Sequence, residues 1–199
     1  MAAFDSVHEF WFGTHPDDAL VAQMQTSLWW SKKTCIDHQI RDRFADLVEL
    51  AGQGRLDGWN SSPVSTLALI LLTDQFPRNI YRDTAQAFQY DAIALKTCLD
   101  GLDKGFDGLL RPIERVFFYL PLEHAESLDL QERSVALFTR LCRQVPAHWS
   151  PVFDGFLDYA IRHRDIIERF GRFPHRNPIL GRAASAEEIQ FMKQPGSSF

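Results

Sequence analysis

Cysteine is scarce in this sequence, and its spacing excludes two common small-protein architectures. The chain contains three cysteines, Cys35, Cys98 and Cys142, and no two of them form a CxxC pair. An odd number of widely spaced cysteines supplies neither a disulfide framework nor a zinc ribbon. We expect three buried or partly buried thiols in a reducing cytoplasm, with a redox-sensing cysteine as the alternative.

Long hydrophobic runs and an export signal are also lacking. The most apolar run, Leu67 to Leu72, is far shorter than the roughly 20 residues that a membrane-spanning helix needs. The first residues, Met1 to Ser6, have neither a basic region nor a long apolar stretch, so they do not resemble a signal peptide. The expectation is a cytoplasmic protein without a membrane partner.

Short motifs of the common enzyme classes are missing as well. The sequence has no GxGxxG and no Walker A motif, so dinucleotide and nucleoside triphosphate sites of those types are unsupported. It has no GxSxG turn and no strand to carry one, which argues against a serine hydrolase. No cofactor is expected.

What is present is an ordinary globular composition with helical periodicity. The chain is 45% hydrophobic and 24% charged, which suffices for one sizeable core and predicts a single domain over residues 1–199. No segment alternates apolar and polar residues with a period of two, whereas apolar residues recur at three- and four-residue steps in most segments. The pattern predicts an all-α domain of about eight helices packed as antiparallel hairpins.

Helix boundaries are marked by serine, proline, aspartate and glycine. A helix through Ile40 and Phe44 is expected to end at Gly52-Gln53-Gly54, and a long helix is expected to end near Phe170, before Gly171. Capping or first-turn proline signals predict helix starts at five places: Ser62-Pro63, Asp83 to Gln86, Pro112, Ser150-Pro151 and Ser185 to Glu188. The helix after Ser62 is expected to continue to Pro77 and to be buried, and the helix after Pro112 is apolar on every side.

Several aromatic and polar motifs occur in a fixed order along the whole chain. They are Glu9-Phe10-Trp11-Phe12-Gly13, Asp74-Gln75-Phe76-Pro77-Arg78-Asn79, Phe117-Phe118-Tyr119-Leu120-Pro121-Leu122-Glu123-His124, Arg169-Phe170-Gly171-Arg172-Phe173-Pro174-His175-Arg176-Asn177, Leu180-Gly181-Arg182 and Pro195-Gly196-Ser197-Ser198-Phe199. With these motifs the chain resembles the bacterial family called domain of unknown function nine-two-four. The resemblance implies an all-helical fold classed with tetratricopeptide-like helical hairpins. It implies no established reaction and no assigned catalytic residues.

The most distinctive local feature is a basic segment near the C-terminus. From Arg162 to Arg182 there are six arginines, no lysine and two acids, a net charge of +4, whereas the whole chain carries −5. A basic site in an acidic protein favours small anions or acidic peptides and argues against a broad nucleic-acid surface. Arginine in place of lysine suits bidentate binding of carboxylate or phosphate.

Polar side chains also fall on helix faces that are otherwise apolar. His163, Asp74 and Glu123 each continue the apolar stepping of their helices, and His124 follows directly after Glu123. Burying an unpaired charge is costly, so each of these groups needs a partner. We expect them to meet one another and the arginines in one polar pocket.

These observations lead to a hypothesis of a pocket for a small anionic ligand, with possible catalysis. The candidate catalytic residues are His163, His175 and Glu123. The candidate ligand-binding residues are Arg172, Arg176, Arg78, Asp74, His124 and Asn177.

Three alternatives stay open at this point. The polar cluster can be structural, with a core histidine and buried ion pairs such as Asp74 with Arg78. The protein can be a tetratricopeptide-like module that binds an acidic peptide in a groove, with aromatic patches at Phe10-Trp11-Phe12 and Trp29-Trp30 either in the core or exposed. A metal site is the weakest alternative, because HExxH and ExxH spacings are absent from the sequence.

Overall fold

The computed structural model describes residues 3–198, and no strand occurs in that part of the chain. The all-α prediction is therefore confirmed, while Phe199, the last residue of the C-terminal motif, lies outside the described residues. The structure has more α-helical segments than the expected eight, because one predicted helix is divided and α1 and α2 had no predicted bounds. The segments are α1 (Ala3–Phe12), α2 (Asp18–Trp30), α3 (Thr34–Gly52), α4 (Pro63–Ile70), α5 (Phe76–Ile80), α6 (Asp91–Asp103), α7 (Pro112–Glu123), α8 (Leu128–Gln144), α9 (Ser150–Phe170) and α10 (Ala186–Phe191).

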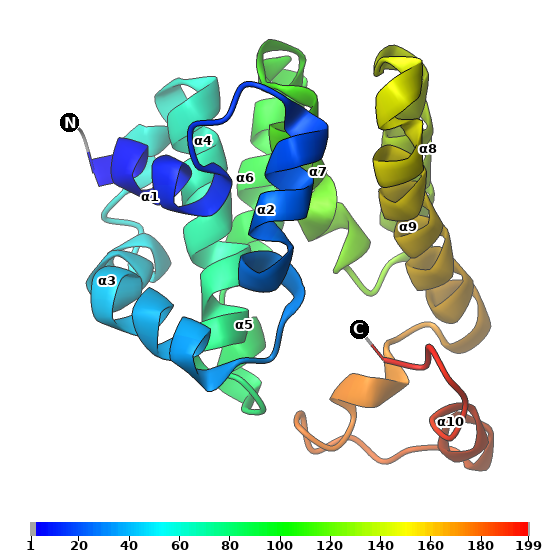
Figure 1. The fold of residues 1–199 in the computed structure, drawn as a ribbon. Helices are drawn as coiled ribbons and strands as arrows, with labels where there is room; N and C mark the ends of the chain where they lie inside the picture. Colours follow the sequence, from blue (N-terminus) through cyan, green and yellow to red (C-terminus); the bar gives the residue numbers. More distant parts are fainter. Residues whose placement is uncertain (1–2, 199) are drawn as a thin grey trace.

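Helices α4 and α7 form the centre of the fold (Figure 1). Every residue of α7 from Ile113 to Glu123 is buried, as the sequence predicts for a helix that is apolar all round. Helices α1, α6 and α7 pack against α4, while α8 and α9 form an antiparallel hairpin beside α7. That hairpin is compatible with tetratricopeptide-like packing, which stays a prediction for the chain as a whole.

Large aromatic rings fill the main core. Trp11, Phe76 and Phe117 are fully buried, and the ring of Trp11 contacts Phe76 in a tilted geometry and Phe117 edge to face. The indole N–H of Trp29 donates to the backbone carbonyl of Trp11 over 2.9 Å, which joins the first two helices. The aromatic patches of the sequence therefore belong mainly to the core, and Trp30 is the member with about half of its surface exposed (48%).

The local start and stop signals of the sequence are mostly confirmed. The Ser62 side chain accepts a hydrogen bond from the Ser65 N–H at the start of α4, and Ser185 and Glu188 form the predicted capping box of α10. Gly171 ends α9 with a φ of +68°, a left-handed conformation that glycine adopts without strain.

The prediction of a capping box from Asp83 to Gln86 is wrong. Asp83 has a φ of +61°, whereas an N-cap residue needs an extended backbone. A 3-10 turn, Ala85–Phe88, follows, and α6 begins only at Asp91. The same residue types thus form a turn here, with Asp83 in the left-handed region.

A π-helical turn, Leu71–Gln75, divides the helix that the sequence predicts as continuous through Pro77. Pro77 has no N–H to donate to the carbonyl of Thr73, and its ring needs room beside that carbonyl. A widened turn supplies the room, because the N–H of Phe76 donates to the carbonyl of Leu71, five residues back. The turn carries Asp74 at its inner face, where that residue is fully buried.

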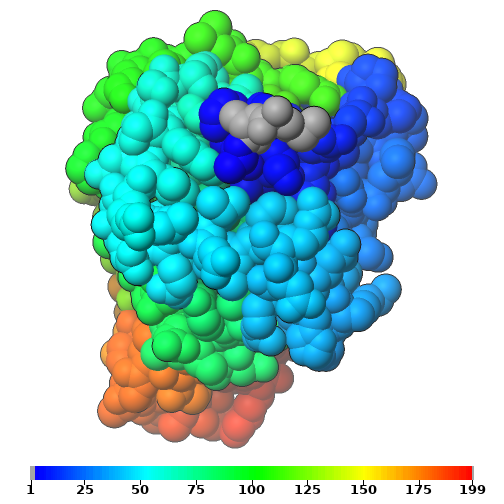
Figure 2. Space-filling view, turned by 90° about the vertical axis from the view of Figure 1, so that its left-hand side faces the viewer, coloured from blue at the N-terminus to red at the C-terminus, as the bar shows by residue number. Residues whose placement is uncertain are grey.

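The residues after α9 fold back beneath the end of α7. Figure 1 shows the 3-10 turn Pro174–Arg176 below α9, and Figure 2 shows the C-terminal residues, orange to red, gathered at one end of the molecule. Ile166, Ile167 and Phe173 form a small apolar cluster of their own there. This arrangement brings the RFGRFPHRN motif to the ends of α5, α6 and α7.

Candidate functional site

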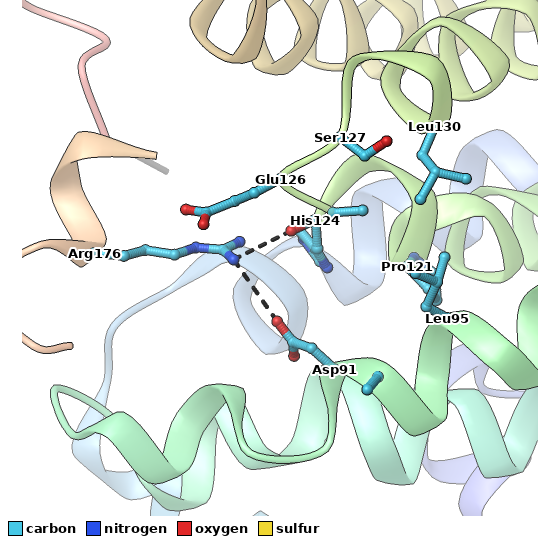
Figure 3. A pocket seen from close by; sticks show the side chains of 10 residues that line it. Asp91, Leu95, Pro121, His124, Glu126, Ser127, Leu130 and Arg176 are labelled. Carbon is cyan, nitrogen blue, oxygen red and sulfur yellow. Dashed lines mark hydrogen bonds and ion pairs between the residues drawn. The ribbon is translucent and has the colours of Figure 1, made fainter. Parts of the chain in front are cut away.

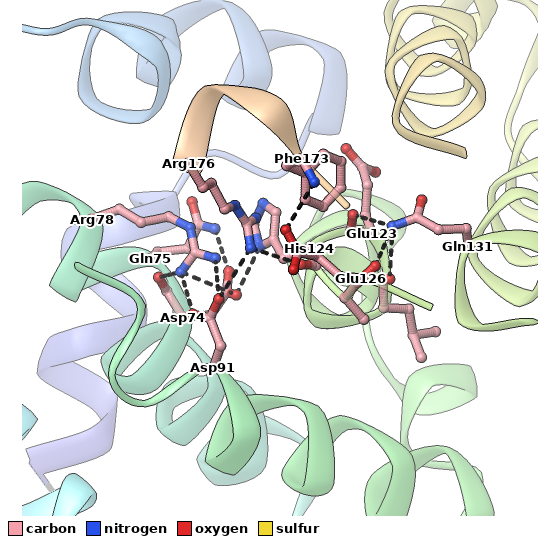
Figure 4. A network of polar contacts seen from close by, with 12 residues as sticks. Asp74, Gln75, Arg78, Asp91, Glu123, His124, Glu126, Gln131, Phe173 and Arg176 are labelled. Carbon is pink, nitrogen blue, oxygen red and sulfur yellow. Dashed lines mark hydrogen bonds and ion pairs between the residues drawn. The ribbon is translucent and has the colours of Figure 1, made fainter. Parts of the chain in front are cut away.

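Two pairs of a carboxyl group and an imidazole lie side by side at the end of α7. Nδ1 of His124 is 2.7 Å from Oδ1 of Asp74, and Nδ1 of His163 is 3.0 Å from Oε1 of Glu123. The two imidazole centroids are 6.2 Å apart. Because consecutive residues of a helix point about 100° apart, Glu123 turns toward α9 while His124 turns toward the π-helical turn (Figure 4).

In the first pair, the carboxylate carries the charge. Burial acts to raise the pKa of Asp74, but the nearby Arg78 guanidinium and His124 hold it well below its usual range. Burial, together with the charge of Arg78, lowers the pKa of His124. At neutral pH the imidazole is therefore neutral and donates its Nδ1–H to Asp74. The described residues form no hydrogen bond with His124 Nε2, which leaves that atom as a proton acceptor.

In the second pair, both groups are mainly uncharged at neutral pH. Burial, reinforced by the charge of Asp74, raises the pKa of Glu123 to about 8. Burial and the neighbouring His124 lower the pKa of His163 well below its usual value. His163 Nδ1 is also 2.8 Å from the carbonyl of Tyr159, and Oε2 of Glu123 has no hydrogen-bond partner among residues 3–198.

Two arginines from different segments share Asp91 at the start of α6. Arg78 donates to both oxygens of Asp91 over 2.9 and 3.1 Å, and it also binds the backbone carbonyl of Asp74. Arg176 donates through Nη1 to the carbonyl of His124 over 3.1 Å, and this atom is 3.7 Å from Oδ2 of Asp91. Burial, and then the charge of Arg78, lowers the pKa of Arg176 to about 10, so Arg176 remains a cation at neutral pH.

Aromatic rings hold the Arg176 guanidinium in position. Its central carbon lies 4.8 Å from the ring centroid of Phe88 and 4.5 Å from that of Phe173. The printed hydrogen bond of this guanidinium uses Nη1, so Nη2 has none to the described residues, and Nε is buried without a hydrogen-bond partner among them. The guanidinium is thus rigid and retains donor capacity.

A surface cavity of about 350 Å³ adjoins these groups. Figure 3 shows its charged side chains, Asp91, Glu126 and Arg176, on one side, and apolar side chains on the other: Leu95, Pro121 and Leu130. His124 also lines the cavity. The cavity therefore presents a cation, a proton acceptor and two carboxylates opposite an apolar wall.

The structure gives several predicted site residues other neighbours. Arg172 donates to both oxygens of Glu188 over 2.7 and 2.9 Å, and Asn177 donates to the same carboxylate and accepts from Arg182. These contacts tie the C-terminal segment together, and Arg172 and Asn177 do not line the cavity.

The predicted catalytic residues His163, His175 and Glu123 do not line the cavity either. The ring of His175 contacts Phe173 at 5.6 Å, and burial, followed by the charge of Arg176, lowers the pKa of His175 to about 4. Of the nine predicted residues, the structure brings Arg176 and His124 to the cavity wall and places Asp74 and Arg78 directly behind them.

In the folded protein, nearby carboxylates balance the net positive charge of the basic segment. Each of its six arginines lies within 3.7 Å of a carboxylate oxygen, in the pairs Arg162–Asp158, Arg164–Asp165, Arg169–Glu187, Arg172–Glu188, Arg176–Asp91 and Arg182–Glu126. Acids from other segments therefore balance the arginines, and the sequence charge alone overstates the local positive field.

Two charged residues of the cavity were missed by the sequence analysis. Asp91 opens α6, and Glu126 follows the end of α7 and binds both Arg182 and the N–H of Phe173. The sequence contains 26 acidic residues, and nothing around an isolated one indicates that it lines a cavity. The position of Glu126 two residues after His124 was the one available indication.

The described residues provide neither a cluster of metal ligands nor a helix suited to span a membrane. Among residues 3–198, no three His, Cys, Asp or Glu side chains are arranged to hold a metal ion. In the same range, no helix has the length and apolarity required to cross a bilayer. Another surface cavity, of about 510 Å³, lies at the end of α3, and none of the predicted site residues lines it.

Comparison with known proteins identifies the family. The model of a bacterial protein family of unknown function, DUF924, matches residues 7–196. A solved structure of a protein of unknown function from Agrobacterium tumefaciens, ATU0120, is 38% identical, with a TM-score of 0.75 over 89% of this chain and 99% of that one. No curated protein matches the sequence. The chain described here belongs to the DUF924 family of bacterial proteins of unknown function.

Proposed function

We propose that the protein binds a small molecule bearing a carboxylate or phosphate in the 350 Å³ cavity. The observation that carries this proposal is the pairing of two groups on the cavity wall: Arg176, a buried cation with an unused donor at Nη2, and His124, whose Nε2 is an unused acceptor. An anionic group bound to Arg176 would lie beside the imidazole.

We assign His124 the role of general base, with Asp74 as the positioning residue. The ionised carboxylate fixes the tautomer by accepting the Nδ1–H, and it stabilises the imidazolium that forms after proton transfer. This assignment differs from the sequence-based choice of His163, His175 and Glu123, because none of those residues lines the cavity.

The cavity supports a small molecule over the acidic peptide of the alternative hypothesis. A volume of about 350 Å³ is at the lower end of small-molecule sites, which span roughly 300 to 1,000 Å³. Arg172, a predicted ligand-binding arginine that a peptide groove would also need, forms an ion pair with Glu188. The site favours a compact ligand bound by one guanidinium.

The experiment is a thermal unfolding screen of the purified protein with phosphate, short carboxylic acids and amino acids. A ligand at 100 times its Kd stabilises the folded state by about 2.7 kcal/mol. The increase in Tm should vanish in Arg176→Gln and persist in Arg143→Gln, which removes an exposed arginine of α8. Equal responses of the two variants, or no response of the wild type, would contradict the proposal.

A further inference from the structure

The charges around the cavity balance one another. Three carboxylates, Asp74, Asp91 and Glu126, are matched by three guanidinium groups, and the pairs are Arg78 with both aspartates, Arg176 with Asp91, and Arg182 with Glu126. With His124 neutral, the set has no net charge. A simple anion would therefore add an uncompensated negative charge, whereas a ligand with charges of both signs would not.

The two carboxylates at the cavity wall retain capacity to accept hydrogen bonds. The side chains of Asp91 and Glu126 are 25% and 26% exposed, while that of Asp74 is 1% exposed. A carboxylate offers about four acceptor positions. Asp91 accepts two hydrogen bonds from Arg78, and Glu126 accepts two from Arg182 and one from the N–H of Phe173. Each can accept a further N–H from the cavity side.

The arginines behind these carboxylates also fix their positions. Arg78 donates two parallel hydrogen bonds to Asp91, and Arg182 donates two to Glu126. This bidentate geometry holds each carboxylate in one orientation. Figure 3 shows Asp91 and Glu126 on either side of the Arg176 guanidinium. A cation bound by one of them would lie next to an anion bound by Arg176.

We propose that the ligand is a free α-amino acid with an apolar side chain. Its carboxylate binds Arg176 Nη2 beside His124, its ammonium group binds Asp91 or Glu126, and its side chain packs against Leu95, Pro121 and Leu130. This inference rests on the proposed function and specifies its ligand. A residue within a peptide would not satisfy the site, because it lacks one or both of the free charged groups.

The test compares three molecules that share one apolar body. Leucine carries both charges, 4-methylpentanoate lacks the ammonium group and 3-methylbutylamine lacks the carboxylate. Phenylalanine, 3-phenylpropanoate and 2-phenylethylamine form a second set. Isothermal titration of the wild-type protein should show at least one amino acid binding about tenfold or more tightly than its deaminated acid, since a hydrogen bond between charged groups is lost. The amines should bind most weakly.

Two variants locate the preference at the cavity. Glu126→Gln and Asp91→Asn each remove one wall carboxylate, and at least one of them should reduce the advantage of the amino acid over the acid to less than about threefold. Asp158→Asn, which removes an exposed carboxylate paired with Arg162 on α9, is the matched control and should keep the full advantage. Thermal unfolding of each variant checks that it is folded.

The outcomes separate this inference from the proposed function. If an acid binds as tightly as its amino acid and Arg176→Gln abolishes both, the ligand is a simple anion; the inference fails and the proposed function stands. If neither amino acids nor acids bind the wild type, the inference fails, and the proposed function then stands only if phosphate raises the Tm of the wild type and not that of Arg176→Gln. An amino-acid preference that both carboxylate variants retain would also overturn the inference.

Discussion

The two acid–imidazole pairs at the end of α7 contain the same functional groups in opposite electrostatic states. Asp74 lies 3.4 Å from the Arg78 guanidinium, which keeps the carboxylate ionised despite complete burial. Among the described residues Glu123 pairs with His163 and with no arginine, and burial raises its pKa to about 8. A buried carboxyl group thus takes its charge from the presence or absence of an arginine, more than from the imidazole that both pairs share.

The comparison also separates a pair that can act on a ligand from one that is enclosed. His124 lines the cavity, whereas His163 is buried between α7, α9 and the ring of Phe173, 5.5 Å away. His163 is buried, as the sequence predicts for an inward-facing residue of its helix, and His124 directly follows the inward-facing Glu123. The ionised carboxylate therefore lies beside the histidine that lines the cavity.

The largest expected effect is on stability, from Asp74→Asn. The substitution leaves Arg78 with one carboxylate, Asp91, in a site where breaking a buried ion pair costs about 3 to 5 kcal/mol. Urea unfolding at pH 7 should show a loss of that order in the free energy of unfolding. The exposed variant Asp158→Asn should show no measurable loss. A loss no greater than that of Glu123→Gln would contradict the assigned charge states.

The second expected effect is a pH-dependent difference in the free energy of unfolding between Glu123→Gln and the wild type. Because folding raises the pKa of Glu123 to about 8, its contribution to stability is present below pH 4.5 and is lost as the pH rises toward 8. Glutamine mimics the protonated form, so the variant should lose less than about 1 kcal/mol at pH 5. Between pH 5 and 8, the free energy of unfolding of the variant should rise relative to that of the wild type by about 2 kcal/mol or more. A constant difference across this range would mean that Glu123 is ionised throughout.

The sequence predicted the features of the fold that depend on neighbours in the chain. Ser62, Gly171 and Ser185 act within one helical turn of their own positions, and their signals were read correctly. Asp83 shows where such local signals fail, since the capping-box pattern from Asp83 to Gln86 occurs in a turn where the φ of Asp83 is positive. The π-helical turn at Asp74 was missed because Pro77 permits either a kink or a widened turn.

The site was predictable in its residue types but not in its pairing. Arg182 meets Glu126 across 56 residues, and His124 meets Asp74 across 50. Nothing in the basic segment indicates that distant acids balance its arginines. The inward positions of Asp74, Glu123 and His163 followed from helical periodicity, whereas the choice of His124 as the imidazole at the cavity required the three-dimensional arrangement.

The smallest expected effect is the order in which the two imidazoles take up protons. Ionised Asp74 stabilises the imidazolium form of His124, whereas Glu123 is already protonated when His163 would titrate. Nitrogen-15 NMR should show both rings neutral at pH 7, with Nε2 of His124 lacking a proton. On acidification His124 should protonate before His163, because the ionised Asp74 stabilises its imidazolium form. Glu123→Gln should leave the titration of His124 in place, while Asp74→Asn should move it to lower pH. If His163 protonated first, Glu123 would have to be the ionised carboxyl group, and the assignment of the proton acceptor would pass from His124 to His163.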